Sequence, residues 1–242
     1  MKIVVVIPTL DEDTSKTIRS IQHQTVKASK ILVAVGSKKL YERLSTGKSA
    51  DVQYFYVQPD FRQPLGKRVA IALNTILAKA NIREYDYILK VDADATLPKH
   101  FIEENLKENA DCLGGSGYAM LIKVSAFLKA FNGKFAEVAA DDTYLGLAFR
   151  RRGYLVKGWR VPPMLRKKRP HSYRWYLTRG AEMYKMGYEP IHVLERMRGD
   201  RRGVLYSLGY ISAMFKRAEQ YALAPWVFRA QIKRLIYGKD TH

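Results

Sequence analysis

The stretch YILKVDADATLPKHFIEENL, residues 87–106, ends an apolar run with two carboxylates one residue apart. The run at residues 87–91 is typical of a strand buried inside a parallel sheet. Asp92 and Asp94 would repel each other at the end of such a strand. A cation held between them is the simplest explanation of this placement, so the chemistry of the chain is expected to centre here.

Around this strand, apolar runs that suit strands alternate with segments of helical spacing. Residues 66–80 predict a helix whose apolar face is formed by Val69, Leu73, Ile76 and Leu77, and residues 13–25 predict a second helix. The alternation predicts an α/β fold with a mostly parallel sheet and right-handed crossovers. The predicted strands lie at 2–9, 30–37, 51–58 and 85–94.

The carboxyl ends of these strands carry polar side chains. In such sheets ligands bind at the carboxyl ends of the strands. Thr9, Ser37 and Asp92 all fall at predicted ends, and we expect them to converge on one crevice.

Composition excludes several classes of protein. With 47% hydrophobic and 12% aromatic residues, the chain of 242 residues can bury a core and is not globally disordered. Cys112 is the single cysteine, which excludes a disulfide framework and fits a reducing, cytoplasmic compartment. No apolar run reaches the roughly 18 residues that a transmembrane helix needs.

Charge divides the chain into two parts. Residues 1–149 hold 20 basic and 17 acidic residues, whereas residues 150–242 hold 22 and 6, a net charge of +16 out of +19. The last third is therefore expected to meet an anionic partner. A boundary is expected near 160–172, where three prolines and a basic run occur together.

The order of motifs resembles a known family. VVVIPTLDED at 4–13, GKRVAIALN at 66–74 and VDADATLPKHFIEENL at 91–106 are similar to GT-A glycosyltransferases of the family 2 type, which include dolichyl-phosphate sugar synthases and polysaccharide synthase domains. The resemblance covers about residues 1–180 and implies a GT-A catalytic domain there. Residues 181–242 would form a basic helical appendage.

The resemblance also implies a nucleotide-sugar donor and a Mg²⁺ or Mn²⁺ ion. The Asp-x-Asp element of the family, which holds the cation that neutralises the donor diphosphate, matches Asp92, Ala93 and Asp94. By the resemblance, Asp94 would bind the metal most directly, and Asp92 would bind the ribose or the metal. A UDP- or GDP-linked sugar would be the donor. The alternative is that these acids are a pair of solvated loop residues or helix N-caps before Pro98. The family positions matching the nucleotide site are Pro8, Thr9, Leu10, Glu12 and Lys67.

The departures from the family pattern are specific. Asp11 stands where Asn is common, and Ala34 and Val35 replace two acids that often end the second strand. These replacements leave the base preference open. Lys67 is chemically suited to a diphosphate, and it also suits the exposed first turn of a helix.

A second acidic pair begins the segment ADDTYLGLAFRRRGY, residues 140–154. By the resemblance, Asp142 would be the catalytic base of an inverting transfer, because the second acid of the pair has this role in the family. A helix N-terminus keeps a carboxylate ionised. The alternative is that Asp141 or Asp142 is a plain helix cap.

The segment HSYRW, residues 171–175, resembles the Gln-x-x-Arg-Trp element of processive members, with His171 in place of Gln. The resemblance places Arg174 at the donor diphosphate. His171 is either a third metal ligand or a surface histidine.

The basic C-terminal part contains two amphipathic segments. Apolar residues recur at Val204, Leu208, Ile211 and Phe215, and again after Pro225. The pattern is typical of helices that lie in a membrane interface, and it also suits helices packed on the catalytic core. We therefore expect peripheral binding to an anionic membrane and an acceptor that is lipid-linked or close to a membrane.

Two other functions fit parts of the sequence. A non-catalytic module binding nucleic acid or lipid headgroups would use the basic third, although no RNA-binding motif, helix-turn-helix or zinc finger accompanies the charge. A nucleotidyltransferase shares paired acids but usually has a Gly- and Arg-rich first loop. The sequence does not indicate the sugar, the acceptor or the oligomeric state.

Overall fold

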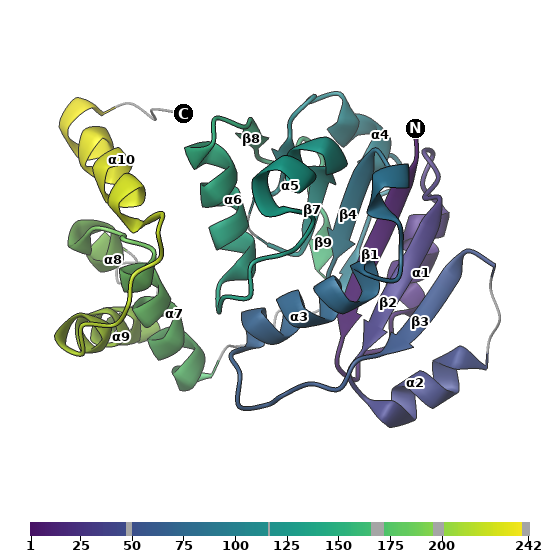
Figure 1. Cartoon of the computed structure of the whole chain (residues 1–242), viewed down its shortest axis with the longest axis horizontal. Helices are drawn as coiled ribbons and strands as arrows, with labels where there is room; N and C mark the ends of the chain where they lie inside the picture. The colour runs from purple at the N-terminus through teal and green to yellow at the C-terminus, as the bar shows by residue number, and fades with distance from the viewer. Residues whose placement is uncertain (47–49, 116, 166–171, 196–200, 239–242) are drawn as a thin grey trace. The chain divides into compact units, whose positions relative to one another are not determined.

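The structure is a computed structural model that describes residues 1–46, 50–115, 117–165, 172–195 and 201–238 (Figure 1). The chain forms two compact units, residues 1–168 and 169–242. The first unit contains every predicted strand, and the second unit is helical. We call them the first unit and the second unit.

The first unit is built on a seven-stranded sheet of order β3-β2-β1-β4-β7-β6-β8. β7 pairs antiparallel with both β4 and β6, and the other neighbours are parallel. The strands are β1 (Ile3–Thr9), β2 (Lys30–Val35), β3 (Val52–Tyr56), β4 (Tyr87–Val91), β6 (Cys112–Leu113), β7 (Ala119–Lys123) and β8 (Val156–Lys157), with a separate short pair of β5 (Ala95–Thr96) and β9 (Met164–Leu165).

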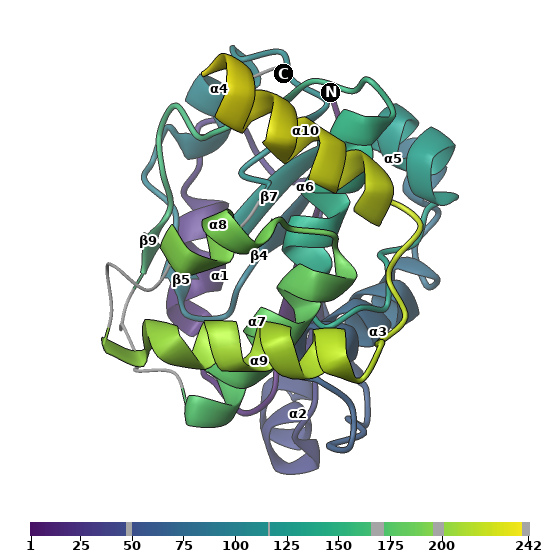
Figure 2. The same cartoon turned by 90° about the vertical axis from the view of Figure 1, so that its left-hand side faces the viewer.

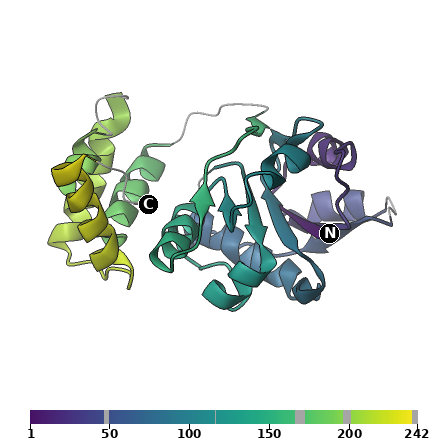
Figure 3. The ribbon, with the colours of Figure 1, turned by 90° about the horizontal axis from the view of Figure 1, so that it is seen from above.

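Helices cover both faces of this sheet because its central strands are apolar on both faces. Ile3, Val5 and Ile7 of β1 point to one core, and Val4 and Val6 to the other. The first core is covered by α1 (Ser15–Gln22), α2 (Lys38–Ser45) and α4 (Phe101–Leu106), and the second by α3 (Leu65–Leu77), α5 (Val124–Phe131) and α6 (Asp141–Arg151) (Figure 3). The predicted α/β fold with a mostly parallel sheet is confirmed.

The second unit is formed by helices that pack through aromatic residues. Met183, Val193 and Tyr210 form one buried cluster in it, with Tyr184, Tyr188 and Tyr206 around them. The helices are α7 (Tyr173–Lys185), α8 (Pro190–Glu195), α9 (Val204–Phe215) and α10 (Ala224–Tyr237) (Figure 2).

Two glycines allow α7 and α9 to approach each other closely. A Cβ on Gly180 would lie 2.7 Å from the carbonyl carbon of Tyr206, and one on Gly209 would lie 2.8 Å from that of Leu177. Gly209, Tyr210 and Ala213 are therefore buried on α9. The opposite face of α9 is exposed, and among the described residues no helix is both long and apolar enough to cross a membrane.

Candidate active site at the carboxyl edge of the sheet

The end of β4 is a tight turn that presents two carboxylates. The N–H of Asp92 donates to the carbonyl oxygen of Tyr118 at 2.8 Å, and the N–H of Ala95 donates to the carbonyl oxygen of Asp92 at 3.0 Å. Ala93 is buried, and its carbonyl oxygen accepts a hydrogen bond from Thr17 Oγ1 at 2.7 Å. Asp92 and Asp94 are both half-buried on this anchored turn.

The second acidic pair lies in the first turn of α6. Asp142 Oδ1 accepts the N–H of Thr143 at 2.7 Å, and its Oδ2 accepts the N–H of Gly117 at 3.1 Å. Asp141 is 7% exposed, and its Oδ2 has no hydrogen-bond partner among the described residues. A helix N-terminus stabilises negative charge, which explains why this sequence can place two acids there.

The two pairs lie close enough to interact electrostatically. Asp94 and Asp142 both act on Asp92, whose pKa is raised first by desolvation. Burial raises the pKa of Asp141 to about 6, with Asp142 and Asp92 adding to the shift and Lys90 opposing it. We call Asp92, Asp94, Asp141 and Asp142 the carboxylate cluster. The structure thus brings the two predicted acidic motifs together.

Lys90 is a buried, charged residue of the site that the sequence reasoning missed. It lies in β4, is 4% exposed, and its Nζ is 3.4 Å from Asp92 Oδ1. Burial alone would lower its pKa, but Asp92, Asp141 and Asp142 together raise it. A lysine inside an otherwise apolar strand is the signal that could have identified it.

The ends of β1 and β2 form the neighbouring part of the edge. Thr9 Oγ1 accepts the N–H of Glu12 at 3.1 Å and donates to its carbonyl oxygen at 3.0 Å. The N–H of Gly36 donates to the carbonyl oxygen of Thr9 at 2.8 Å, and that of Ser37 to Leu10 at 2.7 Å. Pro8, Thr9, Leu10 and Glu12 are therefore held at the same sheet edge as Asp92, next to β4. Their contact with a nucleotide stays a prediction.

Helix α3 packs its first turn against the start of α6. A Cβ on Gly66 would lie 2.9 Å from Asp141 Oδ1 and 2.7 Å from the carbonyl carbon of Ala139. Lys67 follows in the same turn and is half-buried. Asn74 exchanges two hydrogen bonds with the backbone of Phe135, at 2.7 Å and 3.0 Å, and so positions the connection from α5 to α6.

The glycine cluster before β7 also permits close packing. Gly114 has a φ of +73°, and a Cβ there would overlap the Trp159 ring. A Cβ on Gly146 of α6 would lie 2.7 Å from the carbonyl oxygen of Gly115. These glycines allow the backbone to approach its neighbours closely.

The segment HSYRW lies partly outside the described residues and partly in the second unit. His171 is outside the described residues, so its role as a metal ligand stays a prediction. Arg174 lies in α7. Trp175 packs edge-on against Tyr176, with ring centroids 5.2 Å apart. The proposed contact of Arg174 with a diphosphate also stays a prediction.

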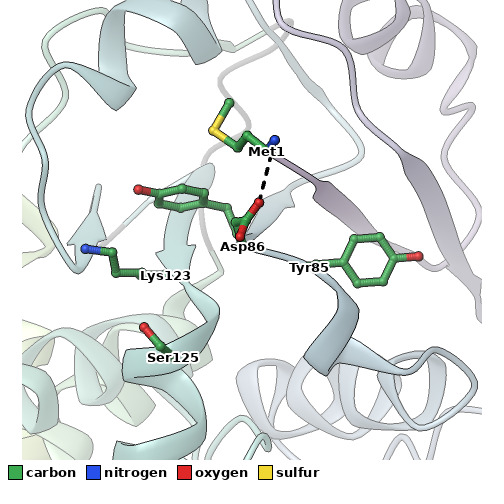
Figure 4. Close-up of a pocket in the computed structure, with 6 residues that line it drawn as sticks. Met1, Tyr85, Asp86, Lys123 and Ser125 are labelled. Carbon is green, nitrogen blue, oxygen red and sulfur yellow. Dashed lines mark ion pairs between the residues drawn. The ribbon is translucent and has the colours of Figure 1, made fainter.

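Two features of the described part of the chain bear on ligand binding. No group of three His, Cys, Asp or Glu side chains is placed there to hold a metal ion. A pocket of about 480 Å³ lies at the amino end of β4, lined by Tyr85, Asp86, Lys123 and Ser125 among others (Figure 4). Because β4 ends at the carboxylate cluster, this pocket lies at the opposite edge of the sheet.

The sheet order and the helix layers match those of GT-A-type glycosyltransferases, and the chain has this fold. A mannosyltransferase from Pyrobaculum calidifontis, PcManGT, solved with GDP-Man and Mn²⁺, has a TM-score of 0.59 at 16% identity, with 99% of this chain and 75% of that chain covered. S. aureus TarS 1–349, solved with UDP, has a TM-score of 0.52 at 14% identity, with 99% of this chain and 92% of that chain covered. The sequence matches no protein-family model and no curated protein.

Proposed function

We propose that the chain is an inverting glycosyltransferase that transfers a sugar from a nucleoside-diphosphate sugar. The observation that carries the proposal is the carboxylate cluster, in which the end of β4 meets the first turn of α6 at the carboxyl edge of a GT-A-type sheet. Solved structures of this fold hold GDP-Man or UDP, which supports a UDP- or GDP-linked donor.

The carboxylates at the end of β4 are suitable ligands for a hard divalent cation. Asp92 and Asp94 offer half-buried carboxylate oxygens, which Mg²⁺ and Mn²⁺ prefer as ligands. These two residues would hold the ion. When bound, it would neutralise the negative charge that the leaving nucleoside diphosphate carries.

Asp142 is the proposed base. The hydrogen bonds from Gly117 and Thr143 orient the carboxylate of Asp142. The proton would come from the acceptor hydroxyl as that oxygen attacks the anomeric carbon. Asp141 is buried and would not reach the substrate directly.

The second unit supports a membrane-proximal acceptor. The exposed stripe of α9 consists of Val204, Leu208, Ile211 and Phe215, which are 47%, 50%, 42% and 79% exposed. Basic residues flank it at Arg202 and at 216–217. An apolar stripe with cations at both ends suits the anionic cytoplasmic face of a membrane, to which each Lys or Arg adds about 1 kcal/mol.

A donor screen tests the reaction. Binding and transfer would be measured with a panel of UDP- and GDP-sugars in Mn²⁺ and in EDTA. We expect one donor to bind more tightly with Mn²⁺. If no donor binds with the metal and none without it, the enzyme proposal fails.

Vesicle flotation tests the membrane part. We expect the full-length protein to float with anionic vesicles at low salt and to be released at high salt. Leu208→Ser with Ile211→Ser should reduce flotation. The matched control replaces two exposed apolar residues of the first unit, Leu155 and Met164, which are 49% and 55% exposed. Equal flotation of both double variants would contradict a role for α9.

A further inference from the structure

Lys90 is a buried cation at the end of a sheet strand. Its partners across the sheet are Val6 in β1 and Met120 in β7, both apolar. Its side chain is 5% exposed, and its ammonium nitrogen is 3.4 Å from Asp92 Oδ1. A buried ammonium is costly unless carboxylates compensate for its lost hydration. Packing alone would be served better by an apolar residue.

Carboxylates from two separate elements act on this ammonium group. Asp92 follows β4, and Asp141 and Asp142 begin α6, and all three stabilise the charged form of Lys90 against its burial. The ammonium group therefore links the two acidic motifs. With Asp94, four negative charges are gathered near one internal positive charge. Without that positive charge, the cluster would repel itself.

We propose that Lys90 is a positioning residue, a built-in cation that holds the carboxylate cluster together when no divalent cation is bound and opposes the binding of that cation. The second half of this inference rests on the proposed function. Lys90 is too buried to contact a donor, so its effect on a metal ion would be electrostatic. A like charge near a metal site weakens metal binding, and in partly buried surroundings the effect is large.

Substitutions that keep or remove the charge separate this role from packing. Lys90→Met keeps a long unbranched side chain and removes the charge, whereas Lys90→Arg keeps the charge. We expect Lys90→Met to lower the Tm in EDTA and to tighten Mn²⁺ binding by about tenfold or more. Lys90→Arg should leave Mn²⁺ affinity within about twofold of the wild type, since the local charge is unchanged.

The matched control removes a lysine charge from another ion pair of the first unit. Lys157 Nζ in β8 lies 3.1 Å from Glu108 Oε2. Lys157→Met should lower the Tm slightly and leave Mn²⁺ affinity unchanged. If Lys90→Met leaves Mn²⁺ affinity unchanged or weakens it, or if Lys90→Arg changes it as much as Lys90→Met does, the opposition to metal binding is refuted.

A double variant keeps the inference testable if Lys90→Met folds poorly. Asp141→Asn removes one negative charge without altering the proposed ligands Asp92 and Asp94. The Tm loss caused by Lys90→Met in EDTA should be at most half as large when Asp141→Asn is present. An equal loss in both backgrounds would overturn the role of Lys90 in holding the cluster together.

The measurements use the full-length protein, thermal unfolding in EDTA, and calorimetric titration with MnCl₂ without any sugar donor. They therefore separate the inference from the proposed function. A wild-type protein that binds no Mn²⁺ would refute the metal part of both, while the stability comparison would still support or overturn the role of Lys90 in holding the cluster.

Discussion

Gly66→Ala should slow transfer more than it weakens nucleotide binding. The added Cβ would lie 2.7 Å from the carbonyl carbon of Ala139, nearer still to its oxygen, and 2.9 Å from Asp141 Oδ1. Ordinary contact begins at 3.4 Å, so the first turn of α3 and the start of α6 must separate by at least 0.7 Å. Asp142 would move with α6, whereas Asp92 and Asp94 follow a different element.

A misplacement of about 1 Å can cost on the order of a hundredfold in rate, so a shift near 0.7 Å is expected to cost about tenfold to a hundredfold. Overpacking should also destabilise the protein by about 1–3 kcal/mol. The assay is single-turnover transfer from the donor found by the screen, together with calorimetric nucleotide binding. We expect the rate to fall by a larger factor than the nucleotide Kd rises, because Lys67 moves with the first turn of α3 whereas Asp92 and Asp94 do not.

The matched control is Gly158→Ala. A Cβ on Gly158 meets nothing within 4 Å, and its φ is not in the left-handed region. This variant should behave as the wild type in both measurements. A Gly66→Ala protein that is folded and transfers at the wild-type rate would refute the role assigned to the contact between α3 and α6.

The remaining predictions concern the carboxylates. Asp142→Asn should lower turnover by roughly two to four powers of ten with donor Kd nearly unchanged, and normal transfer would show that the base lies elsewhere. Asp94→Ala should abolish the Mn²⁺-dependent part of donor binding in calorimetry, whereas Asp51→Ala, an exposed acid at the start of β3, should not. Because the folded pKa of Asp141 is raised from 3.8 to about 6, its contribution to stability is present below pH 4 and lost as the pH rises to about 6. The free energy of unfolding of Asp141→Asn, measured by chemical unfolding relative to the wild type, should therefore rise by on the order of 2–3 kcal/mol between pH 4 and pH 8. A difference between the two proteins that stays constant across this range would contradict the raised pKa of Asp141.

The parts of the fold that were predicted from sequence have local signals. The β-branched runs at 2–9 and 30–37 lie in buried parallel strands, and the apolar face at 66–80 belongs to α3. A strand that is buried on both faces has a continuous apolar run, and a helix that is buried on one face has apolar residues at helical spacing. Both patterns can be recognised in the sequence alone. The acidic pair beginning at Asp141 likewise lies in the first turn of a helix, as expected from helix electrostatics.

The parts that were missed depend on residues distant in the sequence. The strand β7 runs antiparallel inside a mostly parallel sheet, and its direction follows from pairing with β4 and β6 rather than from its own residues. Lys90 interrupts an apolar strand, and only the return of α6 explains it. The sequence shows Gly66 only as a glycine within a predicted helix. The need for a glycine at this position becomes clear from the structure, in which Ala139 lies against it.

The reversed direction of β7 has a consequence for how the protein can diversify. β6 and β7 form a hairpin whose register is fixed by Cys112 with Ile122 and by Leu113 with Leu121. Its tip therefore reaches the carboxyl edge, where Gly117 meets Asp142 and Tyr118 is 45% exposed. A hairpin tip accepts insertions and new side chains without shifting the strands below it. For the proposed glycosyltransferase, acceptor preference could thus be redesigned, by evolution or by directed libraries, at Gly115, Gly117 and Tyr118 while the acids on β4 and α6 keep their places.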